Sequence, residues 1–128
     1  MKKLTLLTIL ILLATLSFSQ VMKKKLDIGV MDYLEEDGWT DNEWRGCNLL
    51  CVIDQENDNI KIYSTVMQDY DLISDAEDVS FDDVQKVKYV AVDADGLICN
   101  FYFAEWGEEQ FIMIEYNTVK WIYRVKND

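Results

Sequence analysis

Residues 84–104 read VQKVKYVAVDADGLICNFYFA, and this stretch decides the fold of the chain. Two runs rich in Val, Tyr, Phe and Ile, residues 84–92 and 97–104, flank the segment Asp93-Ala-Asp-Gly96. An Asp-Gly pair between such runs is a strong short-range signal for a β-hairpin, because Gly accepts the positive φ that a tight turn needs. The stretch therefore predicts two antiparallel strands joined by a tight turn.

The pattern of strands and short turns continues on both sides of this hairpin. The further candidate strands are rich in β-branched and aromatic residues, and they are residues 47–53, 60–65, 70–73, 111–116 and 119–125. The first two flank the polar turn DQENDN and predict a second hairpin. The last two are separated by Asn117-Thr118, which predicts either a tight hairpin or a bulge in one long strand.

The remaining segments show no clear alternation of apolar and polar residues. Residues 20–26 form a basic stub that is either frayed at its start or the beginning of an edge strand. Residues 27–46 are predicted to be irregular and interrupted by glycines, and residues 74–83 are predicted to be a loop. With about six to eight strands joined mostly by local turns, the chain predicts an antiparallel meander. We expect a single all-β domain over residues 20–128, either a small lipocalin-like barrel or a two-layer sandwich, since both forms bury strands and protect edges.

Residues 1–19 have the layout of a secretory signal peptide. Lys2 and Lys3 precede thirteen uncharged, mostly apolar residues at 4–16, and Ser17 and Ser19 place small residues before Gln20. A helix of that length spans about 20 Å, which is short of the ~30 Å hydrocarbon core, and no other segment is long or apolar enough to span it. We expect cleavage between Ser19 and Gln20 and an exported protein, periplasmic or secreted.

Composition excludes several classes of function. The 128 residues contain 24 Asp and Glu against 12 Lys and Arg, and no His. The net charge of −12 argues against a nucleic-acid partner, which requires a basic surface. The lack of His removes Ser-His-Asp and Cys-His catalysis and most zinc sites.

Three cysteines allow at most one internal disulfide. Cys47 and Cys51 would lie about 13 Å apart along one strand, so they cannot pair without a turn. A bridge would therefore use Cys99, with Cys51 or Cys47 opposite it. The alternative is that all three are buried thiols.

Carboxylates suggest two further chemistries. Asp54, Glu56 and Asp58 alternate along a turn in the way that hard cations prefer, which makes them a candidate calcium site. An EF-hand loop would need Gly and Glu at the sixth and twelfth positions, where this chain has Asn59 and Thr65. Two acids at a suitable separation could also hydrolyse a glycosidic bond, and Glu105 and Glu115 are the acids in apolar company.

Four tryptophans contribute to a heavy aromatic load. Trp39, Trp44 and Trp106 occur in turn-like or irregular segments among acids, so they are the candidate binding aromatics. Trp121 lies at strand spacing with Tyr123, and we assign both to the core.

Three phrases of the sequence resemble small exported β-proteins of Bacteroidota-type bacteria. They are IKIYSTVMQDYDLI at 60–73, VAVDADGLICNF at 90–101 and FIMIEYNTVKWIYRV at 111–125, following a signal that ends in SFSQ. The resemblance implies an all-β fold and an envelope location. It implies no functional residues.

Three functional hypotheses follow. The first is a non-catalytic binding module of the envelope that holds a small apolar ligand or a peptide. The second is an acidic interaction or inhibitor protein that docks a basic protein partner. The third and most distant is a carboxylate-based hydrolase.

Overall fold

The computed structural model describes residues 21–127, so the expected signal peptide lies outside the described residues. This part of the chain is all-β and contains ten strands. They are β1 (Val21–Glu35), β2 (Gly38–Trp39), β3 (Arg45–Asp54), β4 (Asn59–Tyr63), β5 (Gln68–Leu72), β6 (Glu77–Asp78), β7 (Val84–Asp93), β8 (Ile98–Trp106), β9 (Glu109–Glu115) and β10 (Val119–Val125). Nowhere in residues 21–127 is there a helix with the length and apolarity of a membrane span.

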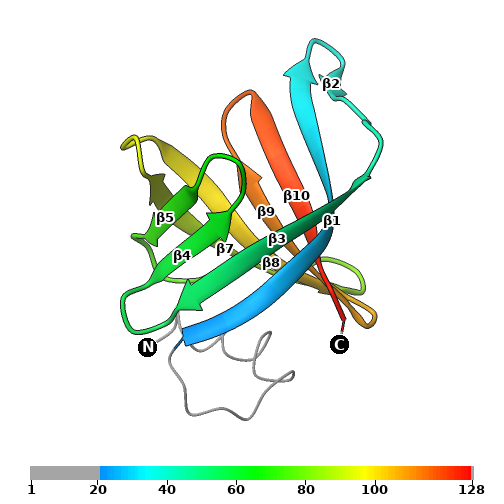
Figure 1. The fold of residues 1–128 in the computed structure, drawn as a ribbon. Helices are drawn as coiled ribbons and strands as arrows, with labels where there is room; N and C mark the ends of the chain where they lie inside the picture. The colour runs from blue at the N-terminus through cyan, green and yellow to red at the C-terminus, as the bar shows by residue number, and fades with distance from the viewer. Residues whose placement is uncertain (1–20, 128) are drawn as a thin grey trace.

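Eight of the strands close into an antiparallel barrel (Figure 1). The order is β1, β3, β4, β5, β7, β8, β9 and β10, and β10 pairs with β1 to complete the cylinder. The short strands β2 and β6 are additions that pair with β1 and β7. The barrel expected from the local connections is therefore confirmed, and the sandwich is not formed.

The predicted hairpins are present with their turns. β7 and β8 pair from Val84 with Trp106 to Val92 with Ile98, and Gly96 has a φ of 82° in the turn between them. β3 pairs with β4, and β9 with β10, so the segment at Asn117 is a hairpin turn rather than a bulge.

Inward-facing side chains fill the part of the barrel nearer the β8–β9 turn. The aromatic rings of Phe101, Phe103 and Tyr89 pack together, with ring centroids 5.2 and 6.0 Å apart. Aliphatic side chains from the facing strands surround them, among them Leu26, Ile60, Ile62, Ile112 and Ile114. Full burial of each such side chain contributes about 1.5–3 kcal/mol.

The prediction of an irregular segment at residues 27–46 was wrong for its first part, which belongs to β1. A β-bulge between Leu26 and Ile28 shifts the register of β1 against both β3 and β10. Before the bulge the inward positions include Leu26, and after it they are Gly29 and Met31. One inserted residue exchanges the two faces of a strand. The apolar alternation is therefore broken in the sequence although the strand continues.

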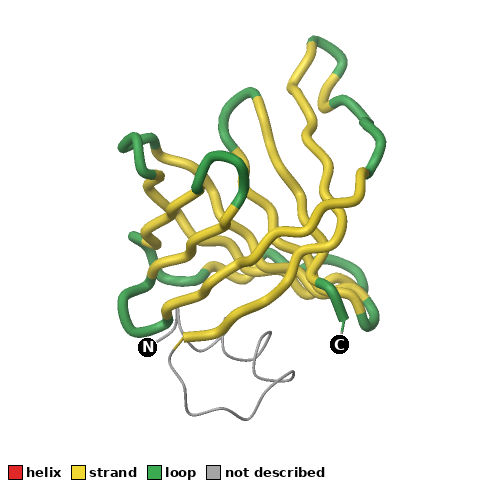
Figure 2. The backbone as a smooth tube through the Cα atoms, in the orientation of Figure 1, coloured by secondary structure: helices red, strands yellow, loops and turns green. Residues whose placement is uncertain are grey.

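The two ends of the barrel differ (Figure 2). One end carries the connections at 36–37, 64–67, 94–97 and 116–118, together with the β2–β3 loop at 40–44, and we call it the open end. At the opposite, closed end, Phe103, Ile112 and Val125 leave a cavity of only about 20 Å³. Among the described residues, the two largest hollows, of about 630 and 440 Å³, lie at the open end. A smaller hollow of about 270 Å³ is lined by Trp39, Asn100 and Glu115.

Gly29 is predicted to be essential for closure. A Cβ at position 29 would lie 2.9 Å from Cδ1 of Tyr123, whose ring is buried against β1. Gly29→Ala should destabilise the protein by about 1–3 kcal/mol, as measured by urea unfolding, because the ring must move. Gly46→Ala is the control, since nothing lies within 4 Å of its Cβ position, and an equal loss in both variants would contradict the prediction.

Candidate functional site

Two hollows meet at the open end of the barrel. Hollow 1, of about 630 Å³, lies between the C-terminal half of β1, the β2–β3 loop and β10. Hollow 2, of about 440 Å³, lies among the turns at 64–67 and 94–97 and the start of β10. Trp121 lines both hollows. Volumes of this size are typical of small-molecule sites.

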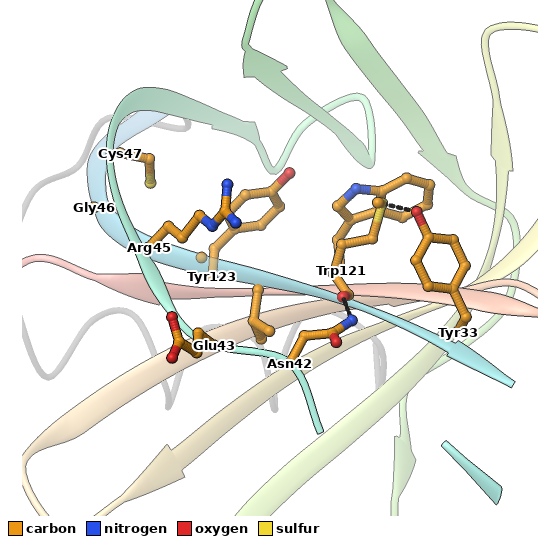
Figure 3. A pocket seen from close by; sticks show the side chains of 11 residues that line it. Tyr33, Asn42, Glu43, Arg45, Gly46, Cys47, Trp121 and Tyr123 are labelled. Atoms are coloured by element: carbon orange, nitrogen blue, oxygen red, sulfur yellow. Dashed lines mark hydrogen bonds between the residues drawn. The ribbon is translucent and has the colours of Figure 1, made fainter. Parts of the chain in front are cut away.

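Trp121 projects from β10 toward the inside of the open end (Figure 3). In this view its ring lies between Tyr123 and Tyr33, and Arg45 and Glu43, from β3 and the β2–β3 loop, also line hollow 1. On its other side Trp121 contacts Tyr116 edge to face, with ring centroids 5.8 Å apart. The indole is only partly buried and presents aromatic surface to both hollows.

A polar layer separates hollow 2 from the apolar core. The Gln68 amide donates to the Tyr123 hydroxyl at 3.1 Å and to Ser64 Oγ at 3.2 Å, and its Oε1 accepts the Tyr70 hydroxyl at 2.7 Å. Tyr70 and Tyr123 are both buried, and burial raises the pKa of each phenol. Both phenols therefore remain neutral, and the floor of the site consists of hydroxyl and amide groups.

Asp93 fixes the wall between β7 and β9. Its Oδ2 accepts the Tyr116 hydroxyl at 2.6 Å, and its Oδ1 accepts the backbone N–H groups of Asp95 and Leu97 at 2.9 Å each. Although burial opposes ionisation, these hydrogen bonds hold the pKa of Asp93 below its usual value. The same contact and burial raise the pKa of Tyr116. One ionised carboxylate thus positions both the turn and an aromatic wall.

Asp32 anchors the loop that forms the outer wall of hollow 1. This carboxylate is only 8% exposed, and its Oδ1 accepts the Asn42 backbone N–H at 2.9 Å and the Thr40 hydroxyl at 3.2 Å. The Asn42 amide then donates to the Met31 carbonyl at 2.6 Å. These contacts tie the β2–β3 loop to β1.

The three tryptophans predicted to bind do not come together. Trp39 is half-buried on β2 beneath the Lys120 ammonium, which lies 4.5 Å from its ring centroid. Trp44 packs edge to face on Phe111 on the outside of the barrel. Trp106 is 57% exposed at the far end of β8, where its indole N–H donates to Asp83. None of the three lines hollow 1 or hollow 2.

The candidate calcium ligands do not converge. Asp54 accepts hydrogen bonds from the Asn57 backbone and side chain in the β3–β4 turn, an arrangement that stabilises the turn itself. Across residues 21–127, no group of three or more Asp, Glu, Cys or His side chains is placed to hold a metal ion. Asp54, Glu56 and Asp58 therefore form a turn and not a cation cage.

The two carboxylates in apolar company are also far apart. Glu115 on β9 pairs in register with Asn100 on β8, and Glu105 lies five residues further along β8. At about 3.4 Å per residue the two groups are about 17 Å apart, outside the 5–9.5 Å range of glycosidase pairs. Glu115 instead accepts the Tyr102 hydroxyl at 3.0 Å.

All three cysteines are free thiols in this structure, so of the two alternatives the bridge from Cys99 to Cys51 or Cys47 is absent. Cys51 is fully buried, and burial raises its pKa to about 12. Burial also raises the pKa of Cys99 to about 11. Cys47 is half-buried and lines hollow 1.

Sequence reasoning missed the residues that do form the site. Trp121 was assigned to the core because it alternates with Tyr123 on the inward face, and both do point inward. The alternation gives the face of the strand but not the height along the barrel axis. Only the turn at Asn117, two residues before β10 begins, signalled that Trp121 lies near an end.

The chain was also compared with known proteins. No protein-family model, curated protein or solved structure matches it.

Loss of the Asp32 anchor should loosen the wall of hollow 1. Asp32→Ala removes two hydrogen bonds to a nearly buried carboxylate, and we expect a loss of about 1–3 kcal/mol in urea unfolding. Asp37→Ala, in the exposed β1–β2 turn, should change stability by less than about 0.5 kcal/mol. Equal effects of the two substitutions would show that the carboxylate does not hold the loop.

The thiols should react in the order of their exposure. In iodoacetamide labelling at pH 8 followed by peptide mass mapping, Cys47 should be modified first and Cys51 last, because the thiolate is the reactive form. In denaturant all three thiols should react with iodoacetamide, and an unreactive pair there would reveal a disulfide.

The buried thiols should also make stability depend on pH. The folded-state pKa values of Cys51 and Cys99 exceed the ordinary 9, so protonation of these thiols favours the folded state. The free energy of unfolding should therefore fall between about pH 9 and pH 12.

Proposed function

We propose that the protein is a non-catalytic binding module that holds a small ligand in the open end of its barrel. The observation that carries this proposal is the difference between the two ends. Two hollows of about 630 and 440 Å³ meet at Trp121, whereas the closed end contains about 20 Å³. A ligand pocket combines apolar walls with a few placed polar groups, and the open end has both.

The rim of the open end supports the same proposal. Val66 is 77% exposed, and Met67 and Leu97 beside hollow 2 are also exposed. Exposed apolar side chains around a concave surface are typical of ligand-binding or interaction sites. The ligand would rest its apolar part on these residues and on Trp121, and its polar part on the Gln68 layer.

The proposed location is the bacterial envelope, on the strength of the signal-like segment at residues 1–19. The acidic surface suits an exported protein that must stay soluble. An envelope protein of this kind would take its ligand from the periplasm or the medium.

A second candidate function uses the closed end. Phe81 and Trp106 are more than half exposed, both adjoin Val84, and Asp82, Asp83 and Glu108 follow them in the chain. An exposed aromatic pair among acids fits the docking of a basic protein partner. Binding of an oligolysine peptide that falls in Trp106→Ala but not in Trp121→Ala would support this candidate.

The first function predicts saturable binding of a neutral aromatic probe. We expect N-phenyl-1-naphthylamine to show enhanced fluorescence with the native protein, and Trp121→Ala to weaken its binding by about tenfold, since the ring shared by both hollows is lost. Native mass spectrometry of the protein from its host should show an added mass of small-molecule size.

Trp106→Ala is the matched control for this test. It removes the same side chain from the closed end, so it should leave probe affinity unchanged, and thermal unfolding should confirm that both variants are folded. Equal weakening by the two substitutions, or no saturable binding by the native protein, would exclude a site at the open end.

A further inference from the structure

The charges around hollow 2 have one sign. Every charged residue that lines it is acidic, namely Asp69, Asp93 and Asp95. Asp69 accepts the Asn59 amide at 2.6 Å and pairs in register with Lys61 on the outside of the barrel, so its charge is partly balanced. No such balance exists for Asp93 or Asp95 within the hollow.

Asp95 is the carboxylate that remains available. Asp93 uses both oxygens in hydrogen bonds to the turn and to Tyr116. The backbone N–H of Asp95 is engaged by Asp93, but within residues 21–127 its carboxylate has no hydrogen-bond or ion-pair partner. It stands at the rim of an aromatic hollow with its charge uncompensated.

The aromatic rings at hollow 2 and those on the outside of the barrel differ in the charged groups that lie near them. Outside, the Lys120 ammonium lies 4.5 Å from the Trp39 ring centroid and the Lys86 ammonium 4.5 Å from that of Tyr102. Lysine therefore satisfies the negative ring faces there. Trp121 lines hollow 2 beside carboxylates, and no Lys or Arg lines that hollow.

The approach to the site is also acidic. The five connections at the open end, residues 36–37, 40–44, 64–67, 94–97 and 116–118, contain no Lys or Arg. Their acidic residues are Glu36, Asp37, Asp41, Glu43 and Asp95. Arg45 lines hollow 1 but not hollow 2, so the charges at hollow 2 and on these connections are acidic. Acidic surroundings attract cationic ligands and repel anionic ones.

We infer that hollow 2 binds a small organic cation, a protonated amine or quaternary ammonium on a compact aromatic body. This inference rests on the proposed function and adds the ligand class. The aromatic body packs on Trp121 and Tyr116, and the cationic group lies toward Asp95. Anionic ligands are excluded, because they would be desolvated among carboxylates without a counter-charge.

The test compares three indoles that differ in charge. Tryptamine is cationic, tryptophol is neutral and indole-3-propionate is anionic, and each is titrated into ¹⁵N-labelled protein produced from the full-length coding sequence. The four Trp indole N–H signals, assigned with Trp→Phe variants, locate the site. We expect tryptamine to shift the Trp121 signal and to bind at least about tenfold more tightly than the other two.

Two charge variants assign the preference to one residue. Asp95→Asn should weaken tryptamine about threefold to tenfold and leave tryptophol unchanged, since only the charge is removed. Glu108→Gln makes the same change in net charge at the closed end and should alter neither. An Asp95→Asn variant that binds tryptamine as the native protein does would overturn the inference.

The outcomes separate this inference from the function on which it rests. If no indole shifts Trp121 while N-phenyl-1-naphthylamine still binds, the inference fails and the binding module stands. If that probe does not bind either, both fail. If tryptophol binds as tightly as tryptamine, the binding module stands and the cation preference fails. An oligolysine peptide at equal ammonium concentration should shift Trp121 less than tryptamine does, and a stronger response to the peptide would overturn a small-molecule ligand.

Discussion

Closure of the barrel depends on the β-bulge at Asp27. β1 pairs with β3 on one edge and with β10 on the other, and the bulge lets it change register against both. Arg124 on β10 holds the bulge through a forked pair, with Nε and Nη2 each 3.0 Å from an Asp27 oxygen. The Arg124 guanidinium lowers the pKa of Asp27, so the carboxylate stays ionised across the neutral range. The strand that closes the barrel and the strand that bears Trp121 are joined at this point.

The bulge also shapes the open end. Beyond it, Gly29 and Met31 face inward, and the missing side chain of Gly29 provides the room that the Tyr123 ring occupies. Tyr123 then meets Gln68 from the far side of the barrel, which completes the polar floor above the apolar core. An irregularity in one strand is thus linked to the depth of the hollow. Bulges often serve to redirect side chains near functional sites.

The candidate site combines a buried, hydrogen-bonded floor with a rim formed in part by connections between strands. The floor residues Tyr70 and Tyr123 are buried and hydrogen-bonded, whereas Val66 and Leu97 on the rim are exposed. Buried, hydrogen-bonded side chains below exposed connections are consistent with the proposed binding module.

The sequence by itself determined the all-β class, the meander and most turns, because strand alternation and Asp-Gly or Asn turns are local properties of the chain. It could not reveal β1 beyond Leu26, since the bulge exchanges the faces and removes the alternation. It placed Trp121 on the inward face but not at the open end, and it favoured Trp39, Trp44 and Trp106 because they lie in turn-like segments. The height of a side chain along the barrel depends on register between strands far apart in the chain. Only the tertiary structure sets that register, and it therefore decided where the hollows, the polar floor and the uncompensated carboxylate lie.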